Sequence, residues 1–257
     1  MENNEINVEY SVDDVPVVQA PEKKPVIKKG WPIVTFVIIG ICIVVYIIEF
    51  LMGLGRSTEM DWQVLIKLGG KFNLLVQAGE YWRLVVPIFL HGDIFHLICN
   101  MYALYVWGPM TEKLFGSVKF SIVFLLSGIA GFILSYAGGS MFSVAIGASG
   151  AIFGIFGAML SFRRQYKLVY KRLIGPSLVL IIILNIVLGF TSQGIDNLGH
   201  IGGLIGGYLA AETVGLNNDN SFKVRKLIFG AVFVLLAAAG IIYGNYRVIN
   251  FDWSSLI

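Results

Sequence analysis

Long stretches of this chain are apolar and contain no ionisable group, and short polar or charged segments separate them. A helix that crosses a bilayer needs roughly 20 apolar residues, and somewhat fewer when it is packed in a bundle. By this measure the hydrophobic pattern predicts seven membrane-spanning helices. They cover residues 31–54, 92–110, 118–138, 149–162, 174–190, 198–214 and 225–244.

The polar segments suggest three parts of the chain. Residues 1–30 are acidic and then basic, so we expect a disordered cytoplasmic tail without activity of its own. The tail has no basic-then-apolar signal peptide, so insertion is expected to begin with the first apolar helix. Residues 31–215 are then expected to form a six-helix core. Residues 216–257 would supply a linker, the seventh helix and a short external tail.

The connection formed by residues 55–91 is much longer than the others. A connection of this length is rarely a passive linker. It contains Trp62, Tyr81 and Trp82, and aromatic residues of this kind favour the membrane–water interface. We therefore expect an external loop with structure of its own, lying in that interface.

Composition supports an integral membrane protein of the all-α polytopic class. Hydrophobic residues make up 56% of the chain and charged residues 14%, against about 25% charged residues in an ordinary soluble domain. The net charge of +3 is too small to indicate nucleic-acid binding. Cys42 and Cys99 both lie in apolar runs, so they do not indicate a disulfide framework.

The distribution of lysine and arginine predicts the orientation in the membrane. With the N-terminus in the cytoplasm, 14 of the 19 basic residues fall on the inner side and five on the outer side. Cytoplasmic segments normally carry this excess. The expected topology is therefore N-terminus inside and C-terminus outside, in a cell membrane, with a bacterial plasma membrane as the expected setting.

Few polar residues lie at membrane depth, and such residues are candidates for function. They are His91, His96, Asn100, Ser149 and His200. A helical rise of about 1.5 Å per residue, counted from the inner helix ends, places His96, Ser149 and His200 at similar depth in the outer half of the bilayer. His91 should lie closer to the outer surface. His96 and Asn100 are four residues apart, so they share one helix face.

Ser149 and His200 together suggest nucleophilic catalysis. Ser149 lies where a loop is expected to meet a helix, and free N–H groups at a helix N-terminus can hold an oxyanion. A serine hydroxyl needs a base to accept its proton, and His200 is the candidate. We expect no Asp or Glu within a span to act as a third member, which predicts a Ser–His dyad. The nucleophile elbow of soluble hydrolases requires a preceding strand, and no strand is expected here.

Each of these signals also has a structural interpretation. Gly-x-Ser-Gly at a helix start is often capping or tight packing, and His96 with Asn100 could simply bond a neighbouring segment. Glycines at 199, 203 and 207 indicate close helix packing. Glu112 at a helix end is expected to be structural. A metal site built on the three histidines is disfavoured, because no carboxylate or thiolate joins them at ligand spacing.

Taken together, these motifs resemble the rhomboid family of intramembrane serine proteases over residues 80–215. The shared features are Tyr81-Trp82-Arg83, His91, His96 through Asn100, the Gly108–Glu112–Gly116 spacing, Gly147-Ala148-Ser149-Gly150, and Gly199-His200 with Gly203 and Gly207. The resemblance implies a six-helix bundle whose active site opens to the outer face. The seventh helix is similar to the C-terminal addition of a subset of the family.

The resemblance also implies roles for individual residues. Ser149 would be the nucleophile, and His200 the general base and then the acid. His96, Asn100 and the Ser149 N–H would stabilise the oxyanion. The implied reaction is hydrolysis of peptide bonds in or near transmembrane segments of single-span or polytopic membrane proteins, within the lipid bilayer and without a cofactor.

The chain departs from some bacterial members at two positions. Phe153 stands where they have a tyrosine, so that a hydroxyl hydrogen bond is lost while the ring can still stack on the histidine. Pro87 stands where they have another histidine. Both candidate catalytic residues are nevertheless present.

Two other functions compete with a protease. One is a non-catalytic rhomboid-like protein that binds membrane clients, although a pure binder would not require both Ser149 and His200. The other is a small transporter or channel. It is disfavoured because no carboxylate or arginine lines a path at the midplane and no internal repeat stands out.

Overall fold

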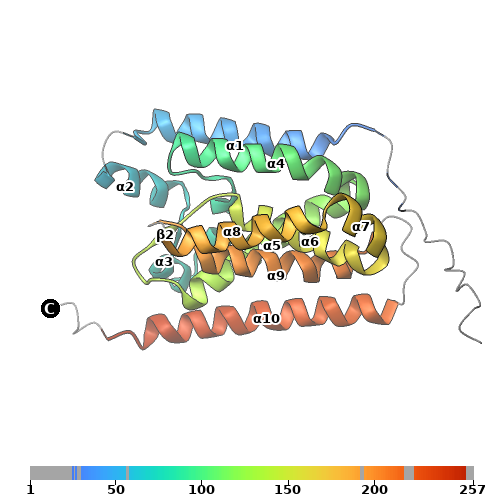
Figure 1. The fold of residues 1–257 in the computed structure, drawn as a ribbon. Helices are drawn as coiled ribbons and strands as arrows, with labels where there is room; N and C mark the ends of the chain where they lie inside the picture. Colours follow the sequence, from blue (N-terminus) through green and yellow to red (C-terminus); the bar gives the residue numbers. More distant parts are fainter. Residues whose placement is uncertain are drawn as a thin grey trace, which may run out of the picture.

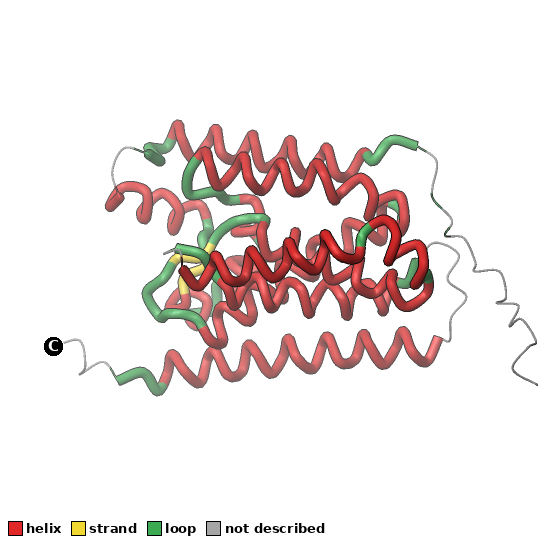
Figure 2. The backbone as a smooth tube through the Cα atoms, viewed as in Figure 1, coloured by secondary structure: helices red, strands yellow, loops and turns green. Residues whose placement is uncertain are grey.

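The computed structural model describes residues 25, 27, 30–55, 58–191, 194–216 and 223–252. Within these ranges nearly all regular structure is helical (Figures 1 and 2). The helices are α1 (Ile33–Leu51), α2 (Thr58–Leu68), α3 (Asn73–Gln77), α4 (Ile94–Phe115), α5 (Ser117–Gly138), α6 (Ser149–Gln165), α7 (Lys167–Leu173), α8 (Gly175–Thr191), α9 (Asn197–Val214) and α10 (Lys223–Ile249). Two short 3-10 helices, η2 (Tyr81–Leu84) and η3 (Val86–Phe89), and two short strands, β1 (Lys71–Phe72) and β2 (Val144–Ala145), complete the described elements.

The seven predicted helices are confirmed as α1, α4, α5, α6, α8, α9 and α10. The second of them continues past the predicted end at residue 110 to Phe115, with Pro109 inside the helix. By length and composition alone, α1, α5 and α10 are apolar enough to cross a membrane, and α8 is a shorter apolar helix. The long helices lie side by side as one bundle (Figure 1), which agrees with a polytopic membrane fold.

The centre of the bundle is α9, which packs most extensively against α5 and α6. Glycines allow this close approach. A Cβ added to Gly203 would overlap the carbonyl oxygen of Gly150, and one added to Gly207 would overlap that of Gly154. Small residues let membrane helices pack backbone against backbone. The packing seam predicted from the glycine spacing is therefore confirmed, and it brings the start of α6 against the start of α9.

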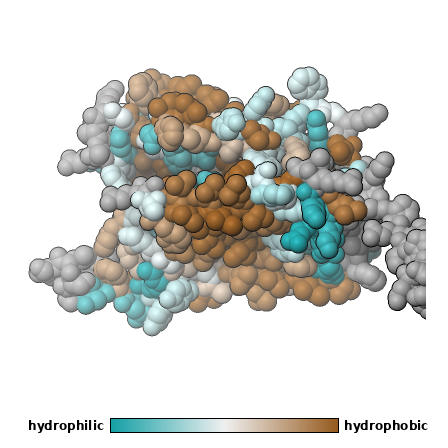
Figure 3. Space-filling model, viewed as in Figure 1, coloured by the Kyte–Doolittle hydropathy of each residue, from teal (hydrophilic) through white to brown (hydrophobic). Residues whose placement is uncertain are grey.

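Apolar side chains also form large patches on the face of the bundle that Figure 3 shows. Only 6% of the most apolar 18-residue stretch of α10 is buried inside the protein, so this helix lies at the periphery. It is attached at both ends. Arg225 contacts Glu212 of α9, and the Arg247 guanidinium donates to the carbonyl oxygen of Ala137 at 2.7 Å. Such an exposed apolar surface is suited to lipid.

The buried carboxylate of Glu112 holds the start of α1 against the end of α4. It accepts hydrogen bonds from the Thr35 N–H and hydroxyl, each at 2.8 Å, and from the Ser117 hydroxyl at 2.7 Å. The Val34 N–H donates at 3.1 Å to Oε1, the oxygen that also accepts the Ser117 hydroxyl, whereas both Thr35 bonds go to Oε2. These bonds satisfy N–H groups at a helix N-terminus that would otherwise lack partners. The structural role expected for Glu112 is confirmed.

The segment between α1 and α4 contains α2, β1, α3, η2 and η3, so the long connection is structured, as predicted. The expectation that no strand precedes Ser149 is wrong. β2 pairs antiparallel with β1, Lys71 opposite Ala145 and Phe72 opposite Val144. Two-residue strands give no alternating pattern in the sequence, and only the meeting of two distant segments creates them. We call this end of the bundle, with α2, α3 and the strands, the loop end (Figure 2).

The opposite end carries α7, a short helix that the sequence did not predict. We call it the α7 end. Much of the predicted 1–30 tail and of the 217–222 linker lies outside the described residues.

Candidate active site

Ser149 is the first residue of α6, directly after a tight turn from β2. Gly147 makes this turn with a φ of 112°, a conformation that side chains rarely adopt. Its N–H donates to the carbonyl oxygen of Pro87 at 2.8 Å, which fixes the turn to the loop before α4. Ala148 supplies no side-chain cap to α6. The half-buried Ser149 therefore stands beside helix N–H groups that no preceding side chain occupies.

His96 and Asn100 of α4 face the same turn. A Cβ added to Gly147 would lie 2.7 Å from Nε2 of His96 and 3.7 Å from Nδ2 of Asn100. The Asn100 amide nitrogen is buried and has no hydrogen-bond partner among the described residues. A buried donor without a partner is costly unless a ligand or water uses it. The two side chains predicted to share a face thus converge two residues before Ser149.

His200 lies in the first turn of α9, at the level where α9 meets α6. A Cβ added to Gly150, the residue after Ser149, would lie 3.3 Å from the carbonyl oxygen of Gly199, the residue before His200. The His200 ring stacks on Phe153 of α6, with centroids 4.3 Å apart and an interplanar angle of 8°. The structure therefore brings the starts of both helices together, one carrying the serine and the other the histidine.

His91 is completely buried within the protein, in the segment between η3 and α4. Its ring packs edge-on against His96 at 5.1 Å between centroids. Burial lowers the pKa of His91 to about 3, and the neighbouring His96 adds to the shift. His91 is therefore neutral near pH 7, and its ring contacts the ring of His96.

Glu49 is a buried acidic residue within the first predicted span, and the hydrophobic pattern did not single it out. It lies in α1, and its carboxylate accepts the backbone N–H of His91 at 3.1 Å. An acidic residue inside the first apolar run was the signal that could have revealed it. The Glu49 carboxylate therefore ties the segment before α4 to α1.

A second buried polar group lies beneath the loop end. Lys71 is completely buried, and its ammonium donates to Oδ1 of Asn73 at 3.0 Å. Burial lowers the pKa of Lys71 to about 8. The negative charge of Asp196 opposes this shift and the positive charge of Arg247 adds to it. Asp196 caps α9 by accepting the Gly199 N–H at 2.9 Å. This cluster was not predicted, because its members come from distant segments.

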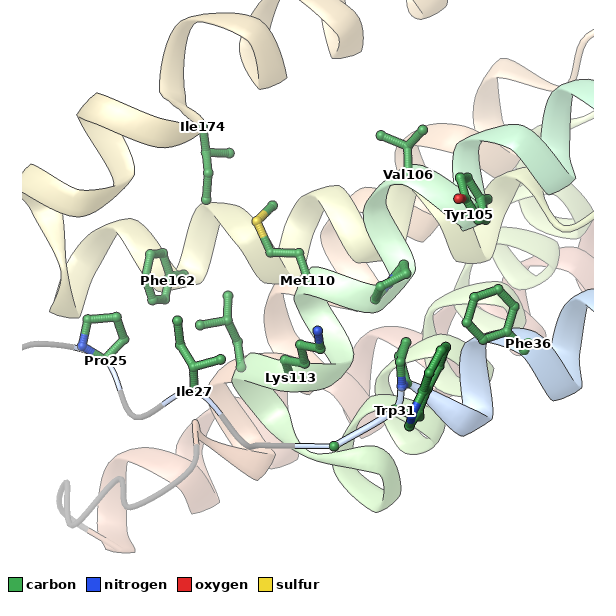
Figure 4. A pocket seen from close by; sticks show the side chains of 14 residues that line it. Pro25, Ile27, Trp31, Phe36, Tyr105, Val106, Met110, Lys113, Phe162 and Ile174 are labelled. Atoms are coloured by element: carbon green, nitrogen blue, oxygen red, sulfur yellow. The ribbon is translucent and has the colours of Figure 1, made fainter.

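A large apolar pocket of about 1000 Å³ lies elsewhere, between the start of α1, the second half of α4 and the end of α6 (Figure 4). Phe162 lines it, thirteen residues along α6 from Ser149. At 1.5 Å per residue this separation is roughly 20 Å. The pocket is therefore distinct from the convergence of Ser149, His96 and His200. Among the described residues, no three His, Cys, Asp or Glu side chains are grouped so as to hold a metal ion.

Comparison with known proteins identifies the fold. The family model described as Rhomboid domain matches residues 78–217. The chain belongs to the rhomboid family. All five candidate residues lie inside the matched range of this rhomboid chain, whereas α1 and α10 lie outside it.

Several relatives carry rhomboid names. The chain is 37% identical over 239 residues to rhomboid protease GluP of Bacillus subtilis, covering 93% of this chain and 46% of that protein. It is 39% identical over 167 residues to RHOMBOID-like protein 5 of Arabidopsis thaliana, covering 64% and 54%. It is 32% identical over 152 residues to rhomboid-like protease 1 of Toxoplasma gondii, covering 56% and 51%. The chain thus spans about half the length of these relatives. The match and the apolar helices establish a multi-pass membrane protein of the rhomboid fold.

Proposed function

We propose that this chain is an intramembrane serine endopeptidase that hydrolyses peptide bonds in or near the transmembrane segments of other membrane proteins. The observation that carries the proposal is the convergence at the Gly147 turn. Ser149 opens a helix there, and the buried, unpaired Asn100 amide and the His96 ring face it from α4. The protease names of relatives such as GluP support the same activity.

In the proposed reaction, Ser149 and His200 act as a dyad. The Ser149 oxygen attacks the carbonyl carbon of the substrate while His200 Nε2 accepts the hydroxyl proton. The tetrahedral intermediate collapses as His200 returns the proton to the leaving amine, which breaks the peptide bond. Water then attacks the acyl-enzyme, again with His200 as base, and releases the new carboxylate and the free Ser149.

The negative charge that develops on the carbonyl oxygen requires hydrogen-bond donors already in place. The Asn100 amide, a protonated nitrogen of the His96 ring and the Ser149 N–H are the proposed donors. Asn100 is suited to this role because its amide nitrogen has no competing partner among the described residues. Three donors from two helices would fix the oxyanion beside the nucleophile.

The proposed orientation places the loop end outside the cell and the α7 end in the cytoplasm. The basic residues Arg163, Arg164, Lys167 and Lys171 at the α7 end support it, because cytoplasmic segments normally carry such an excess. The test replaces both native cysteines (Cys42→Ser and Cys99→Ser) and then introduces one new cysteine at a time. The two test variants are Lys167→Cys and Asp252→Cys, and each is treated with a membrane-impermeant thiol reagent on intact cells. We expect labelling at position 252 and protection at 167; the reverse pattern would refute the orientation.

The decisive test compares the purified parent with Ser149→Ala in detergent and in liposomes. A generic single-span membrane protein serves as substrate, and a fluorophosphonate probe reports a reactive serine. We expect cleavage and labelling in the parent and neither in the variant. Folded parent protein that shows neither would overturn the proposal and favour a non-catalytic protein that binds membrane clients.

A further inference from the structure

Two buried polar atoms near the start of α9 lack partners. They are Nδ1 of His200 and Oδ2 of Asp196, and neither has a hydrogen-bond partner among the described residues. His200 as a whole is 8% exposed. Buried polar atoms are paired in the great majority of cases, so two unpaired polar atoms at the start of one helix require an explanation.

The cap of α9 brings the two groups to the same helical turn. Asp196 is the N-cap residue, and its carboxylate folds back over the first turn, so that a Cβ added to Gly199, the residue before His200, would lie 2.9 Å from Oδ2. The backbone N–H of His200 donates to the carbonyl oxygen of Asp196 at 3.0 Å, which closes the first helical turn. No direct hydrogen bond joins the two side-chain atoms, and a polar contact longer than about 3.5 Å is commonly bridged by a water molecule.

Both side chains are held in place by other contacts. The Asp196 carboxylate is fixed through Oδ1, which accepts the Gly199 N–H at 2.9 Å. The His200 ring is fixed by the stacked ring of Phe153. One carboxylate oxygen and one ring nitrogen are thereby left over, and neither side chain can turn away easily without losing its existing contact.

The proposed catalytic role makes the state of Nδ1 important. If His200 Nε2 accepts the Ser149 proton, neutral His200 must carry its hydrogen on Nδ1, because a neutral imidazole has one N–H. The hydrogen bond made by one ring nitrogen determines which tautomer is present. An acceptor on the Nδ1 side would therefore favour the tautomer that can act as base, and it would stabilise the imidazolium that forms next.

We propose that Asp196 is a positioning residue for His200, with Oδ2 accepting the Nδ1–H hydrogen bond through one water molecule. This inference rests on the proposed function. Ser149, His200 and Asp196 would then form a triad in which a water molecule links the last two. Its acidic member, Asp196, precedes α9 and does not lie within a membrane span. The buried Lys71 ammonium interacts with the charge of the same Asp196 carboxylate, so this carboxylate faces the protein interior and not only the end of α9.

Two substitutions separate positioning from helix capping. Asp196→Asn and Asp196→Ser both retain a side-chain oxygen that can cap α9, since Asn and Ser are preferred N-cap residues. Neither retains a carboxylate. The matched control is Asp93→Asn, because Asp93 caps α4 in the same way by accepting the His96 N–H at 2.8 Å.

The first readout does not depend on activity. The chain has three histidines, so protein labelled with ¹⁵N-histidine gives three ring systems, which His91→Phe and His96→Phe variants assign. We expect the Nδ1–H tautomer of His200 to dominate in the parent. Its population should fall in both Asp196 variants and stay unchanged in Asp93→Asn. An unchanged tautomer in folded Asp196→Asn protein would overturn the inference.

The second readout is kinetic. We expect kcat to fall about 10- to 100-fold in Asp196→Asn with KM within about twofold, because a proton-transfer step rather than substrate binding is weakened. Equal loss in Asp93→Asn would point to capping and overturn the inference. If the parent neither cleaves nor reacts with the fluorophosphonate, the proposed function fails, while the tautomer measurement still decides whether Asp196 orients His200.

Discussion

The ring of His200 lies flat against the ring of Phe153, with centroids 4.3 Å apart and an interplanar angle of 8°. Phe153 is one turn after Ser149 on α6, and it is itself buried. The nucleophile and the surface that orients its proposed base thus belong to one rigid helix. A change in the packing of α6 therefore affects both candidate catalytic groups together.

Replacing the Phe153 ring should impair the orientation of His200 more than it impairs folding of the protein. An aromatic pair contributes about 0.5–1.5 kcal/mol beyond its buried area, so we expect Phe153→Leu to reduce kcat about 3- to 10-fold and Phe153→Tyr to retain activity. Phe156→Leu is the control, because Phe156 is equally buried and packs on Trp107 and Phe153. Initial cleavage rates measure the effect. An equal loss in the control would indicate a general packing defect.

The two candidate catalytic residues should be dispensable for folding. Ser149→Ala and His200→Ala are expected to abolish measurable turnover in folded protein. In detergent the thermal midpoint of Ser149→Ala should change by less than about 3 °C, because no described hydrogen bond involves the half-buried Ser149 side chain. The midpoint of His200→Ala should fall by a few degrees, because this variant loses the stacking on Phe153. Fluorophosphonate labelling and a thermal scan give the two quantities. Unfolding of both variants would contradict the catalytic assignment.

Removal of a proposed oxyanion donor should lower kcat and leave KM unchanged. Removal of one such donor typically costs 10²- to 10³-fold in kcat, and we expect losses of about this size for His96→Ala and Asn100→Ala. Cys99→Ala is the control, because Cys99 is exposed on the same helix. Steady-state kinetics on a membrane-protein substrate provide the measurement. If Asn100→Ala retained parental kcat, Asn100 could not be a donor.

The seam between α6 and α9 should not tolerate a side chain. Gly203→Val would push against the Gly150 carbonyl group, which is backbone and cannot turn aside. Overpacking of this kind costs about 1–3 kcal/mol or more, and we expect loss of the folded state. Gly40→Val is the matched control, because a Cβ at Gly40 would meet nothing within 4 Å. Equal stability of the two variants would contradict the close packing.

Lys71 should make stability depend on pH in the alkaline range. Its pKa is lowered to about 8 in the folded protein, from 10.5. Between these values the unfolded chain binds more protons than the folded chain, so the free energy of unfolding should rise as pH increases from about 8 to 10. In Lys71→Met this rise should be smaller. Thermal midpoints at several pH values measure it, and identical pH profiles would refute a buried, destabilised ammonium.

The sequence by itself determined the helices and the candidate chemistry. Each apolar run becomes a helix because a bilayer leaves a backbone few other ways to satisfy its hydrogen bonds. Helical periodicity also placed His96 and Asn100 on one face, and the glycine spacing of α9 indicated its close contact with α6. These features depend on local rules, in which residues a few positions apart determine the outcome.

Only the tertiary structure decided how distant segments meet. The pairing of β1 with β2, the bond from Glu49 to His91 and the charge interaction between Lys71 and Asp196 join residues that are 42 to 125 positions apart. Two-residue strands have no detectable alternation, and a single acidic or basic residue in the sequence does not indicate its partner. Such pairs form because burial makes an unpaired polar group costly, and burial exists only once the helices have packed.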